Sequence, residues 1–279
     1  MSDPDPRLIL ARSDLADCRL EGLVRAARFA PVQAMRCIVP CAAIRTAADD
    51  GSELQDQLLF GEAFDVLDFK DGWSWGQAVR DGYVGYVRTG DLALRLETPT
   101  HRVRMLRTFG YVRPDLKAPA GGGYSLNTLV RAGRSENGFI EAGEAGWIYE
   151  AHLAPIGEFE TDPVAVAGRF LGAPYLWGGR DSLGLDCSGL IQQAFYACGL
   201  ACPRDTDQQM ATFSEPAPLS ELGRGDLVFW RGHVGIMVDA ERLLHANAFH
   251  MAVALEPLAT AVPRIKAAGA GELMALRRP

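Results

Sequence analysis

The fold of this chain is decided by Gly184-Leu185-Asp186-Cys187-Ser188-Gly189-Leu190. A turn precedes Cys187, and apolar residues follow it at helical spacing as far as Cys198. The pattern therefore predicts a helix that begins at Cys187 and is closed by Gly199. The backbone N–H groups and the dipole at a helix N-terminus favour a thiolate and lower the pKa of a cysteine. Cys187 is therefore a candidate nucleophile.

Two histidines follow in separate runs with strand character. These runs are Gly232-His233-Val234-Gly235-Ile236-Met237-Val238 and Leu243-Leu244-His245-Ala246-Asn247. A turn at Ala240-Glu241 would make them neighbouring antiparallel strands and bring the two rings together. We expect His233 to act as base and acid for Cys187, and His245 to orient the ring of His233. Each residue alone would be an ordinary structural residue, but their order and glycine context favour catalysis.

The composition is that of an ordinary globular protein and excludes some partners. The 279 residues are 48% hydrophobic and 23% charged, with a formal net charge of -7. Nucleic-acid binding needs clustered Lys and Arg, and because no basic run is present we expect no nucleic acid partner. No stretch approaches the roughly 18 apolar residues of a membrane span, and residues 1–6 lack a secretory pattern. A cytoplasmic location without membrane association is expected, and the oligomeric state stays open.

The six cysteines are expected to be mostly reduced in that compartment, and five of them to be small buried hydrophobes. Cys37 and Cys41 form a Cys-x3-Cys pair, as do Cys198 and Cys202, which invites comparison with zinc sites. Neither pair has the usual ligand spacing or a second pair nearby. The sequence therefore predicts neither a metal nor an organic cofactor.

The first part of the chain predicts a lead-in followed by a small barrel. Residues 1–33 are expected to be irregular, with a short helix within the stretch from Leu15 to Phe29. Residues 34–97 contain five short alternating runs separated by turns. Asp71-Gly72 and Asp81-Gly82 favour tight hairpins between these runs. Many short strands with such turns predict a β-barrel.

The remainder predicts a second barrel and then an α+β domain. Residues 98–156 repeat the strand pattern in a degenerate form, with a loop that contains Gly121-Gly122-Gly123. In residues 157–279, Thr161 or Asp162 would cap a helix that starts at Pro163. The helix at Cys187 follows, and strands are predicted for residues 226–230, 233–239, 242–247, 251–256 and 273–276. Helices followed by an antiparallel sheet indicate an α+β layout.

Residues 162–256 resemble the NlpC-type cell-wall cysteine peptidases, which have a papain-like fold. The resemblance is carried by six short pieces in order: Pro174-Tyr175-Leu176-Trp177-Gly178-Gly179, Asp186-Cys187-Ser188-Gly189-Leu190, Pro203-Arg204-Asp205-Thr206, Gly225-Asp226-Leu227-Val228-Phe229-Trp230, Gly232-His233-Val234-Gly235-Ile236 and His245-Ala246. The two barrels resemble bacterial SH3-like domains. The implied fold class is α+β: an NlpC-type domain with helices on an antiparallel sheet, preceded by two SH3-like β-barrels.

The resemblance implies hydrolysis of the γ-D-glutamyl–diamino acid bond of wall peptides by Cys187, His233 and His245. It implies that Tyr175 directs its hydroxyl toward the oxyanion beside the backbone N–H of Cys187, and that Trp177 lines the substrate site. Asp186 and Ser188 would hold the amine and backbone of the first substrate residue. The alternative for Tyr175 and Trp177 is packing in an aromatic wall. A turn and a helix cap explain Asp186 and Ser188 equally well.

In similar enzymes the first barrel closes the groove, so that only a murein peptide with a free N-terminal L-Ala fits. Glu62 and Tyr83 occupy motif positions for that contact, because a carboxylate suits an ammonium group. A solvated barrel charge is the alternative for Glu62. Two other functions stay open at this point. One is an amidase or acyltransferase on the same scaffold, and the other is a non-catalytic protein that binds wall peptides.

Overall fold

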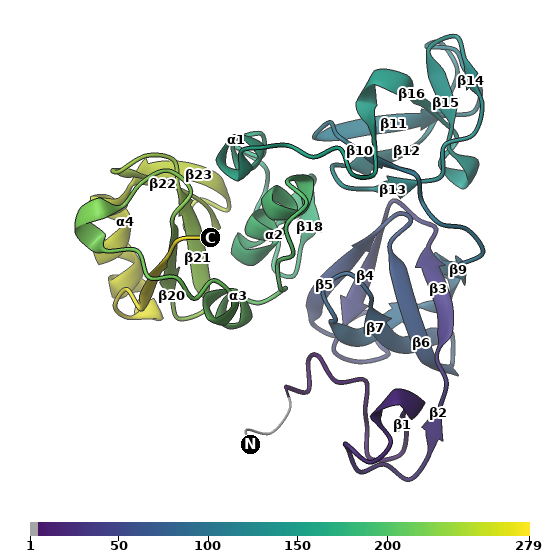
Figure 1. Cartoon of the computed structure of the whole chain (residues 1–279), viewed down its shortest axis with the longest axis horizontal. Helices are drawn as coiled ribbons and strands as arrows, with labels where there is room; N and C mark the ends of the chain where they lie inside the picture. The colour runs from purple at the N-terminus through teal and green to yellow at the C-terminus, as the bar shows by residue number, and fades with distance from the viewer. Residues whose placement is uncertain (1–4) are drawn as a thin grey trace. The chain divides into compact units, whose positions relative to one another are not determined.

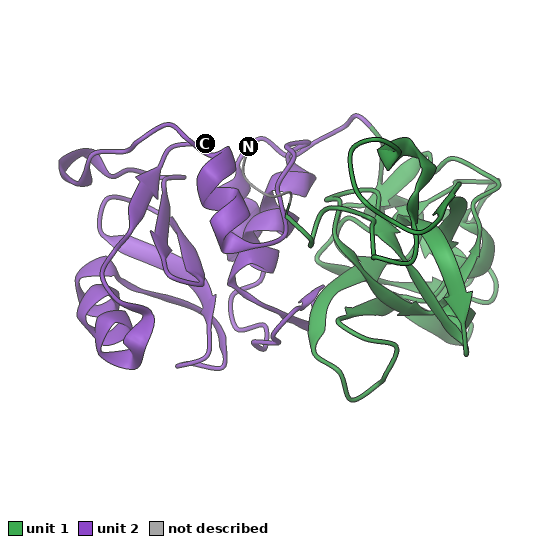
Figure 2. Cartoon of the chain, turned by 90° about the horizontal axis from the view of Figure 1, so that it is seen from below, with its two compact units in different colours: residues 1–156 green, residues 157–279 purple. Residues whose placement is uncertain are grey.

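A computed structural model describes residues 5–279 of the chain. The chain divides into two units, Met1–Ile156 and Gly157–Pro279, which are coloured separately in Figure 2. The boundary falls where the sequence changes from short β-runs to a capped helix. Within the described residues, no helix is long and apolar enough to span a bilayer.

The first barrel of unit 1 is a seven-stranded antiparallel sheet. Its strands, in spatial order, are β5 (Leu54–Leu59), β4 (Cys41–Arg45), β8 (Val84–Arg88), β7 (Trp73–Ala78), β6 (Ala63–Lys70), β3 (Gln33–Cys37) and β9 (Leu92–Leu94). Side chains that alternate along these strands, such as Ile44, Phe64 and Val66, fill the barrel. Asp71 and Gly72 both have positive φ, as a type I′ hairpin requires, so that turn prediction is confirmed.

The second barrel contains a three-stranded and a five-stranded antiparallel sheet. The first has the order β13 (Leu129–Val130), β10 (His101–Val103), β17 (Leu153–Pro155), and the second β12 (Ala120–Ser125), β11 (Arg107–Tyr111), β16 (Trp147–Tyr149), β15 (Phe139–Glu141), β14 (Ser135–Glu136). The predicted loop at Gly121-Gly122-Gly123 is wrong, because these glycines lie within β12. Glycine disfavours strands, but here pairing with β11 outweighs that preference: Gly123 lies opposite Phe109.

The predicted helix between Leu15 and Phe29 is also wrong. The segment forms a parallel pair of short strands, β1 (Ala16–Asp17) and β2 (Phe29–Ala30), with a 3-10 turn between them. Leu10 and Leu15 pack against Leu67 and Trp75 of the first barrel. Leu15 is therefore used as a contact of an extended segment, and this tertiary packing overrides helix propensity.

Unit 2 is an α+β domain, as predicted (Figure 1). Its helices are α1 (Pro163–Gly168), α2 (Cys187–Ala197), α3 (Thr206–Thr212) and α4 (Leu258–Ile265). Its antiparallel sheet has the order β23 (Ala252–Pro257), β22 (Arg242–Asn247), β21 (His233–Met237), β20 (Leu227–Trp230), β24 (Ala275–Arg277), and a short hairpin joins β18 (Arg180–Asp181) to β19 (Gly184–Leu185). Asp162 caps α1 by accepting the N–H groups of Val164 and Ala165. Helix α2 packs against β21 and β22, which brings its N-terminus to the sheet.

Gly189 allows the start of α2 to lie against the chain that leads into it. A Cβ at this position would lie 2.3 Å from the carbonyl oxygen of Gly179, closer than real Cβ contacts allow. The obstacle is backbone, so it cannot be relieved by a rotamer change. Glycine is therefore needed at a helix position where alanine would have the higher helix propensity.

We predict that Gly189→Ala destabilises unit 2 by about 1–3 kcal/mol, because overpacking outweighs the propensity gain of about 1 kcal/mol. Chemical denaturation monitored by circular dichroism measures the change. Gly168→Ala is the matched control. This glycine is also helical, and a Cβ there would meet nothing within 4 Å, so its effect should be neutral or stabilising. Equal behaviour of the two variants would contradict the packing argument.

Candidate functional site

Cys187 is the first residue of α2 and is buried, with 6% of its surface exposed. The hairpin of β18 and β19 delivers the chain to this point, and the carboxylate of Asp186 caps the helix by accepting the N–H of Gly189 at 2.7 Å. The Sγ atom lies 3.9 Å from the carbonyl oxygen of Gly232. The backbone N–H of Val234 also acts on the sulfur. The thiol therefore lies against the backbone on both sides of His233.

A buried network fixes the start of α2. Arg204 donates from Nη2 to Oδ2 of Asp186 at 2.6 Å and from Nη1 to the hydroxyl oxygen of Ser188 at 2.7 Å. Ser188 in turn donates to Asp186 Oδ1, and the N–H of Gly178 donates to Oδ2. Breaking a buried ion pair of this kind is strongly destabilising. Asp186 and Ser188 thus have the cap function that local grounds allowed. Their substrate contact stays a prediction.

The two histidine rings meet, as the strand arrangement predicted. His233 Nε2 lies 2.8 Å from His245 Nδ1, and the rings are carried by the neighbouring strands β21 and β22. Gly235 leaves room for this contact, since a Cβ there would lie 3.1 Å from the Cβ of His245. The same Cβ would lie 2.7 Å from Cδ1 of Leu243, so the side chains of Leu243 and His245 fill the space beside this glycine. With Nε2 engaged, Nδ1 of His233 is the ring nitrogen left for the thiol.

The expectation of a lowered thiol pKa is wrong for the protein without substrate. Burial raises the pKa of Cys187 to about 12, and the negative charge of Asp186 adds to the effect. The N–H groups of Val234 and Ser188 and the charge of Arg204 oppose this shift but do not outweigh it. The helix N-terminus therefore moderates the cost of ionising the thiol without making the thiolate the resting form.

Both imidazoles are neutral for the same reason. Burial lowers the pKa of His233 to about 3, and the pKa of His245 also falls to about 3. The charge of Arg264 lowers both values, whereas Glu256 and Asp186 raise that of His233. A neutral imidazole beside a neutral thiol can act as a general base, taking the proton as the sulfur attacks.

Tyr175 lies close enough to Cys187 for the charge of the sulfur to act on its hydroxyl. Burial raises the pKa of Tyr175, and Cys187 and Asp186 raise it further, so the phenol remains a donor. Its N–H donates to the carbonyl oxygen of Met251 at 3.0 Å, which ties this segment to the start of β23. Trp177, two residues on, is 57% exposed. Packing in an aromatic wall does not account for that exposure, and its substrate role stays a prediction.

Glu62 and Tyr83 lie in unit 1 and have partners within the first barrel. Glu62 accepts the N–H of Leu59 at 3.0 Å and pairs with Arg80 at 2.5 Å. Because Glu62 is only 1% exposed, its interpretation as a solvated charge is wrong. The hydroxyl of Tyr83 donates to Gln55 at 2.8 Å. These bonds give both residues a structural function, and their contact with a substrate amine stays a prediction.

Sequence reasoning missed Glu256 and Arg264. His245 Nε2 lies 2.7 Å from Glu256 Oε1, and Arg264 of α4 pairs with the same carboxylate. Glu256 was assigned to a strand, but the pairing of that strand was unknown. In the structure Glu256 lies opposite Leu243, two positions from His245 on the same face of the sheet. Alternation along β23 could have shown which face Glu256 occupies, but the pairing register that places it beside His245 is not encoded locally.

His245, His250 and Glu256 place their donor atoms within 4.8 Å of one another, as metal ligands would. The surrounding contacts argue for hydrogen bonding instead. Arg264 already pairs with Glu256, and its positive charge would oppose a cation. His250 Nδ1 is engaged by Asn247 at 2.9 Å. The expectation that the site uses no metal stays a prediction, and this cluster does not require one.

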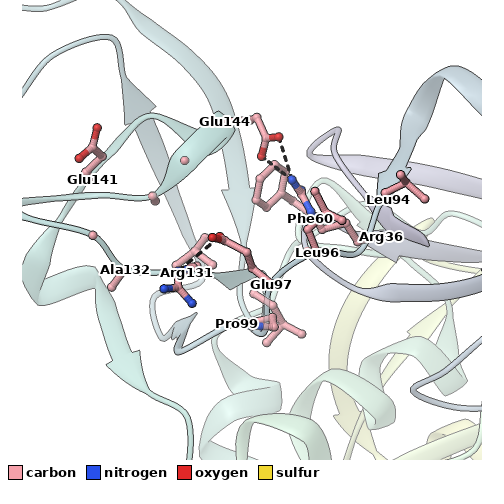
Figure 3. Close-up of a pocket in the computed structure, with 16 residues that line it drawn as sticks. Arg36, Phe60, Leu94, Leu96, Glu97, Pro99, Arg131, Ala132, Glu141 and Glu144 are labelled. Atoms are coloured by element: carbon pink, nitrogen blue, oxygen red, sulfur yellow. Dashed lines mark hydrogen bonds and ion pairs between the residues drawn. The ribbon is translucent and has the colours of Figure 1, made fainter. Parts of the chain in front are cut away.

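A cavity of about 610 Å³ lies in unit 1 beside the junction of the two barrels (Figure 3). Its charged groups face one another: Arg36 pairs with Glu144 at 2.8 Å, and Arg131 with Glu97 at 3.3 Å. Phe60 forms part of the wall. Among the described residues that line this cavity there is no cysteine or histidine.

Comparison with known proteins confirms the resemblance inferred from the sequence. Residues 172–269 match the NlpC/P60 family, and residues 44–92 match the bacterial dipeptidyl-peptidase SH3 domain. The chain is 33% identical over 137 residues to a gamma-D-glutamyl-L-lysine dipeptidyl-peptidase of Bacillus subtilis, covering 44% of this chain and 46% of that protein. It thus spans about half the length of that relative.

A second relative and one solved structure extend the comparison. A gamma-D-glutamyl-L-lysine dipeptidyl-peptidase of Bacillus cereus is 24% identical over 243 residues, covering 76% of this chain and 72% of that protein. The crystal structure of a NlpC/P60 family protein from Bacillus cereus has a TM-score of 0.74 at 20% identity, covering 88% of this chain and 99% of that one. The latter likeness shows a shared fold. The chain therefore carries an NlpC/P60 domain preceded by a bacterial SH3 domain.

Proposed function

We propose that this protein is a cysteine peptidase that cleaves the γ-D-glutamyl–diamino acid bond of murein-derived peptides. One observation carries the proposal: the buried thiol of Cys187 lies at a helix N-terminus, against the backbone that flanks a histidine whose far nitrogen is bonded to a second histidine. A nucleophile, a base and a group that orients the base are the parts that nucleophilic catalysis needs.

The proposed reaction starts from neutral groups. Cys187 Sγ attacks the γ-carbonyl carbon of the D-glutamyl residue while the thiol proton passes to Nδ1 of His233. The C–N bond then breaks as the imidazolium gives this proton to the leaving amine nitrogen, and the D-glutamyl group remains on sulfur as a thioester. A water molecule that loses its proton to His233 hydrolyses the thioester, and the thiol regains its proton.

The oxyanion formed during attack needs donors that are already in place. Cys187 is the first residue of α2, and N–H groups in the first turn of a helix have no acceptor within the helix. We propose the N–H of Cys187 as one donor and the hydroxyl of Tyr175 as the other. The effect of the sulfur charge on that hydroxyl supports this pairing.

The substrate class is supported by two relatives whose names state a gamma-D-glutamyl-L-lysine dipeptidyl-peptidase activity. For this chain we propose peptides such as L-Ala-γ-D-Glu followed by L-Lys or diaminopimelate. Release of a dipeptide from the amino end implies recognition of a free N-terminal amine. A cytoplasmic location, where such peptides would be soluble fragments, is part of the same proposal.

The first test is hydrolysis of L-Ala-γ-D-Glu-diaminopimelate and its L-Lys counterpart, with release of L-Ala-D-Glu followed by mass spectrometry. Wild-type protein should cleave at least one of them, and Cys187→Ala should lose activity by a factor of at least about 10³, because the nucleophile is gone. Cys198→Ala, at the other end of α2, should retain activity. Cleavage by the Cys187→Ala variant would refute the proposed mechanism.

The other functions considered are outcomes of the same assay. Turnover of acyl esters or simple amides without cleavage of the tripeptides would indicate an amidase or acyltransferase on this scaffold. Tripeptide binding measured by calorimetry, with no turnover of any of these compounds, would indicate a wall-peptide-binding protein. Either result would replace the peptidase proposal.

A second prediction concerns the amino end of the substrate. Acetylation removes the positive charge of the terminal amine and adds bulk. If recognition of this amine is part of binding, kcat/KM should fall by at least about tenfold, equivalent to about 1.4 kcal/mol. Paired assays of the free and acetylated tripeptide give the ratio directly. Equal kcat/KM for the two substrates would show that the enzyme acts within peptides without regard to their amino end.

A further inference from the structure

Glu256 and Arg264 form the outer end of a hydrogen-bond chain that reaches His233. His233 Nε2 lies 2.8 Å from His245 Nδ1, and His245 Nε2 lies 2.7 Å from Glu256 Oε1. Arg264 pairs with that same oxygen. His245 has no exposed surface and Glu256 is buried, so water has little access to the bonds between them.

The chain of bonds determines where each proton lies. An ionised carboxylate can only accept, so His245 must carry its proton on Nε2. Nδ1 of His245 is then a lone pair, and it must accept from a proton on Nε2 of His233. Nδ1 of His233 is therefore left unprotonated, which is the form a general base requires.

We propose that Glu256 is a positioning residue that fixes the tautomers of both histidines, and that Arg264 holds its carboxylate in place. This inference rests on the proposed function, because it assigns the base of that reaction. Without the acceptor at Glu256, the donor groups of Arg264 would face His245 and favour the opposite tautomer. The proton would then occupy Nδ1 of His233, where the thiol needs a lone pair.

Glu256 and Arg264 are positioned by two different elements, β23 and α4. Glu256 lies near the end of β23, and α4 begins directly after it, which returns Arg264 to the same face of the sheet. Helix α4 packs on β23 and β22. On its other side, the guanidinium of Arg264 stacks over the ring of Phe249, 4.3 Å from the ring centre. A stacked and ion-paired guanidinium has little freedom to leave the carboxylate.

The charges around the histidines act in opposite directions. Arg264 lowers the pKa values of His233 and His245, and Glu256 raises that of His233. From the turn after β22, His250 lowers the pKa of His245, and from the start of α2, Asp186 raises that of His233. Loss of Glu256 should therefore lower the pKa of His233, and loss of Arg264 should raise it. A purely structural role of the two residues would not produce shifts in opposite directions.

The first arm of the test measures tautomers by NMR of the ¹⁵N-labelled histidine rings in the full chain. In the wild type, both rings should carry the proton on Nε2. Glu256→Gln should keep this pattern, because its amide oxygen can accept from both His245 and Arg264. Glu256→Met removes the acceptor at similar volume and should shift His245 toward the Nδ1-protonated form. Glu272→Gln, which removes an exposed glutamate paired with Lys266, is the matched control.

The second arm measures kcat and KM as functions of pH with the tripeptide. Glu256→Met should lower kcat by at least about a hundredfold with little change in KM, since the wrong tautomer in a serine-protease triad costs about 10⁴. Glu256→Gln should lower kcat by about tenfold. It should also move the acid limb of the pH profile, where kcat falls on acidification, to lower pH, because the carboxylate charge that raises the pKa of His233 is lost. Arg264→Gln should move that limb to higher pH.

The two arms separate this inference from the proposed function. Nδ1-protonated His245 in the wild type, or unchanged ring signals in Glu256→Met, would overturn the positioning role whether or not the protein cleaves tripeptides. Acid limbs that shift in the same direction for Glu256→Gln and Arg264→Gln would also overturn it. If the wild type is inactive on every peptide while the rings have the expected tautomers, the proposed function fails and the hydrogen-bond chain stands.

Discussion

The geometry of the candidate site depends on the hydrogen bond between Nε2 of His233 and Nδ1 of His245, formed across two neighbouring strands in a buried site. This bond turns the remaining nitrogen of His233 away from its partner ring. Helix α2 brings the thiol of Cys187 to the backbone on either side of that histidine. Helix α2 thus supplies the thiol and the sheet supplies the two imidazoles, and the proposed hydrolysis needs both.

Burial gives the site its electrostatic character. It raises the pKa of the thiol and lowers those of both imidazoles, so the resting pair is neutral. The charged residues nearby form ion pairs within the protein. Arg204 pairs with Asp186 at the start of α2, and Arg264 pairs with Glu256, which also contacts His245. In the reaction that we propose, charge develops only as the sulfur attacks, where the N–H of Cys187 and the hydroxyl of Tyr175 would stabilise it.

Much of this site could be predicted from local pattern, because the thiol, the helix that follows it and the two histidine strands are each encoded within a few residues. The hairpin at Asp71-Gly72 was predictable for the same reason. Properties set by distant packing were not predictable. The stretch from Leu15 to Phe29 has apolar residues at helical spacing but forms short strands, with Leu15 packed on the first barrel. The pairing of Glu256 with His245 depends on strand register. The raised pKa of Cys187 depends on burial, which the helix N-terminus alone does not reveal.

In the unliganded site, the thiol of Cys187 and the imidazole of His233 are both neutral. Titration of the ultraviolet thiolate absorbance, taken as the difference between the wild type and Cys187→Ser, tests it most directly. If the resting thiol is neutral, no thiolate signal is expected at about pH 6, and the signal should appear only in the alkaline range, above the ordinary cysteine pKa of about 8.5. A thiolate signal already present at about pH 6, and lost on further acidification, would show a pre-formed ion pair and contradict the account.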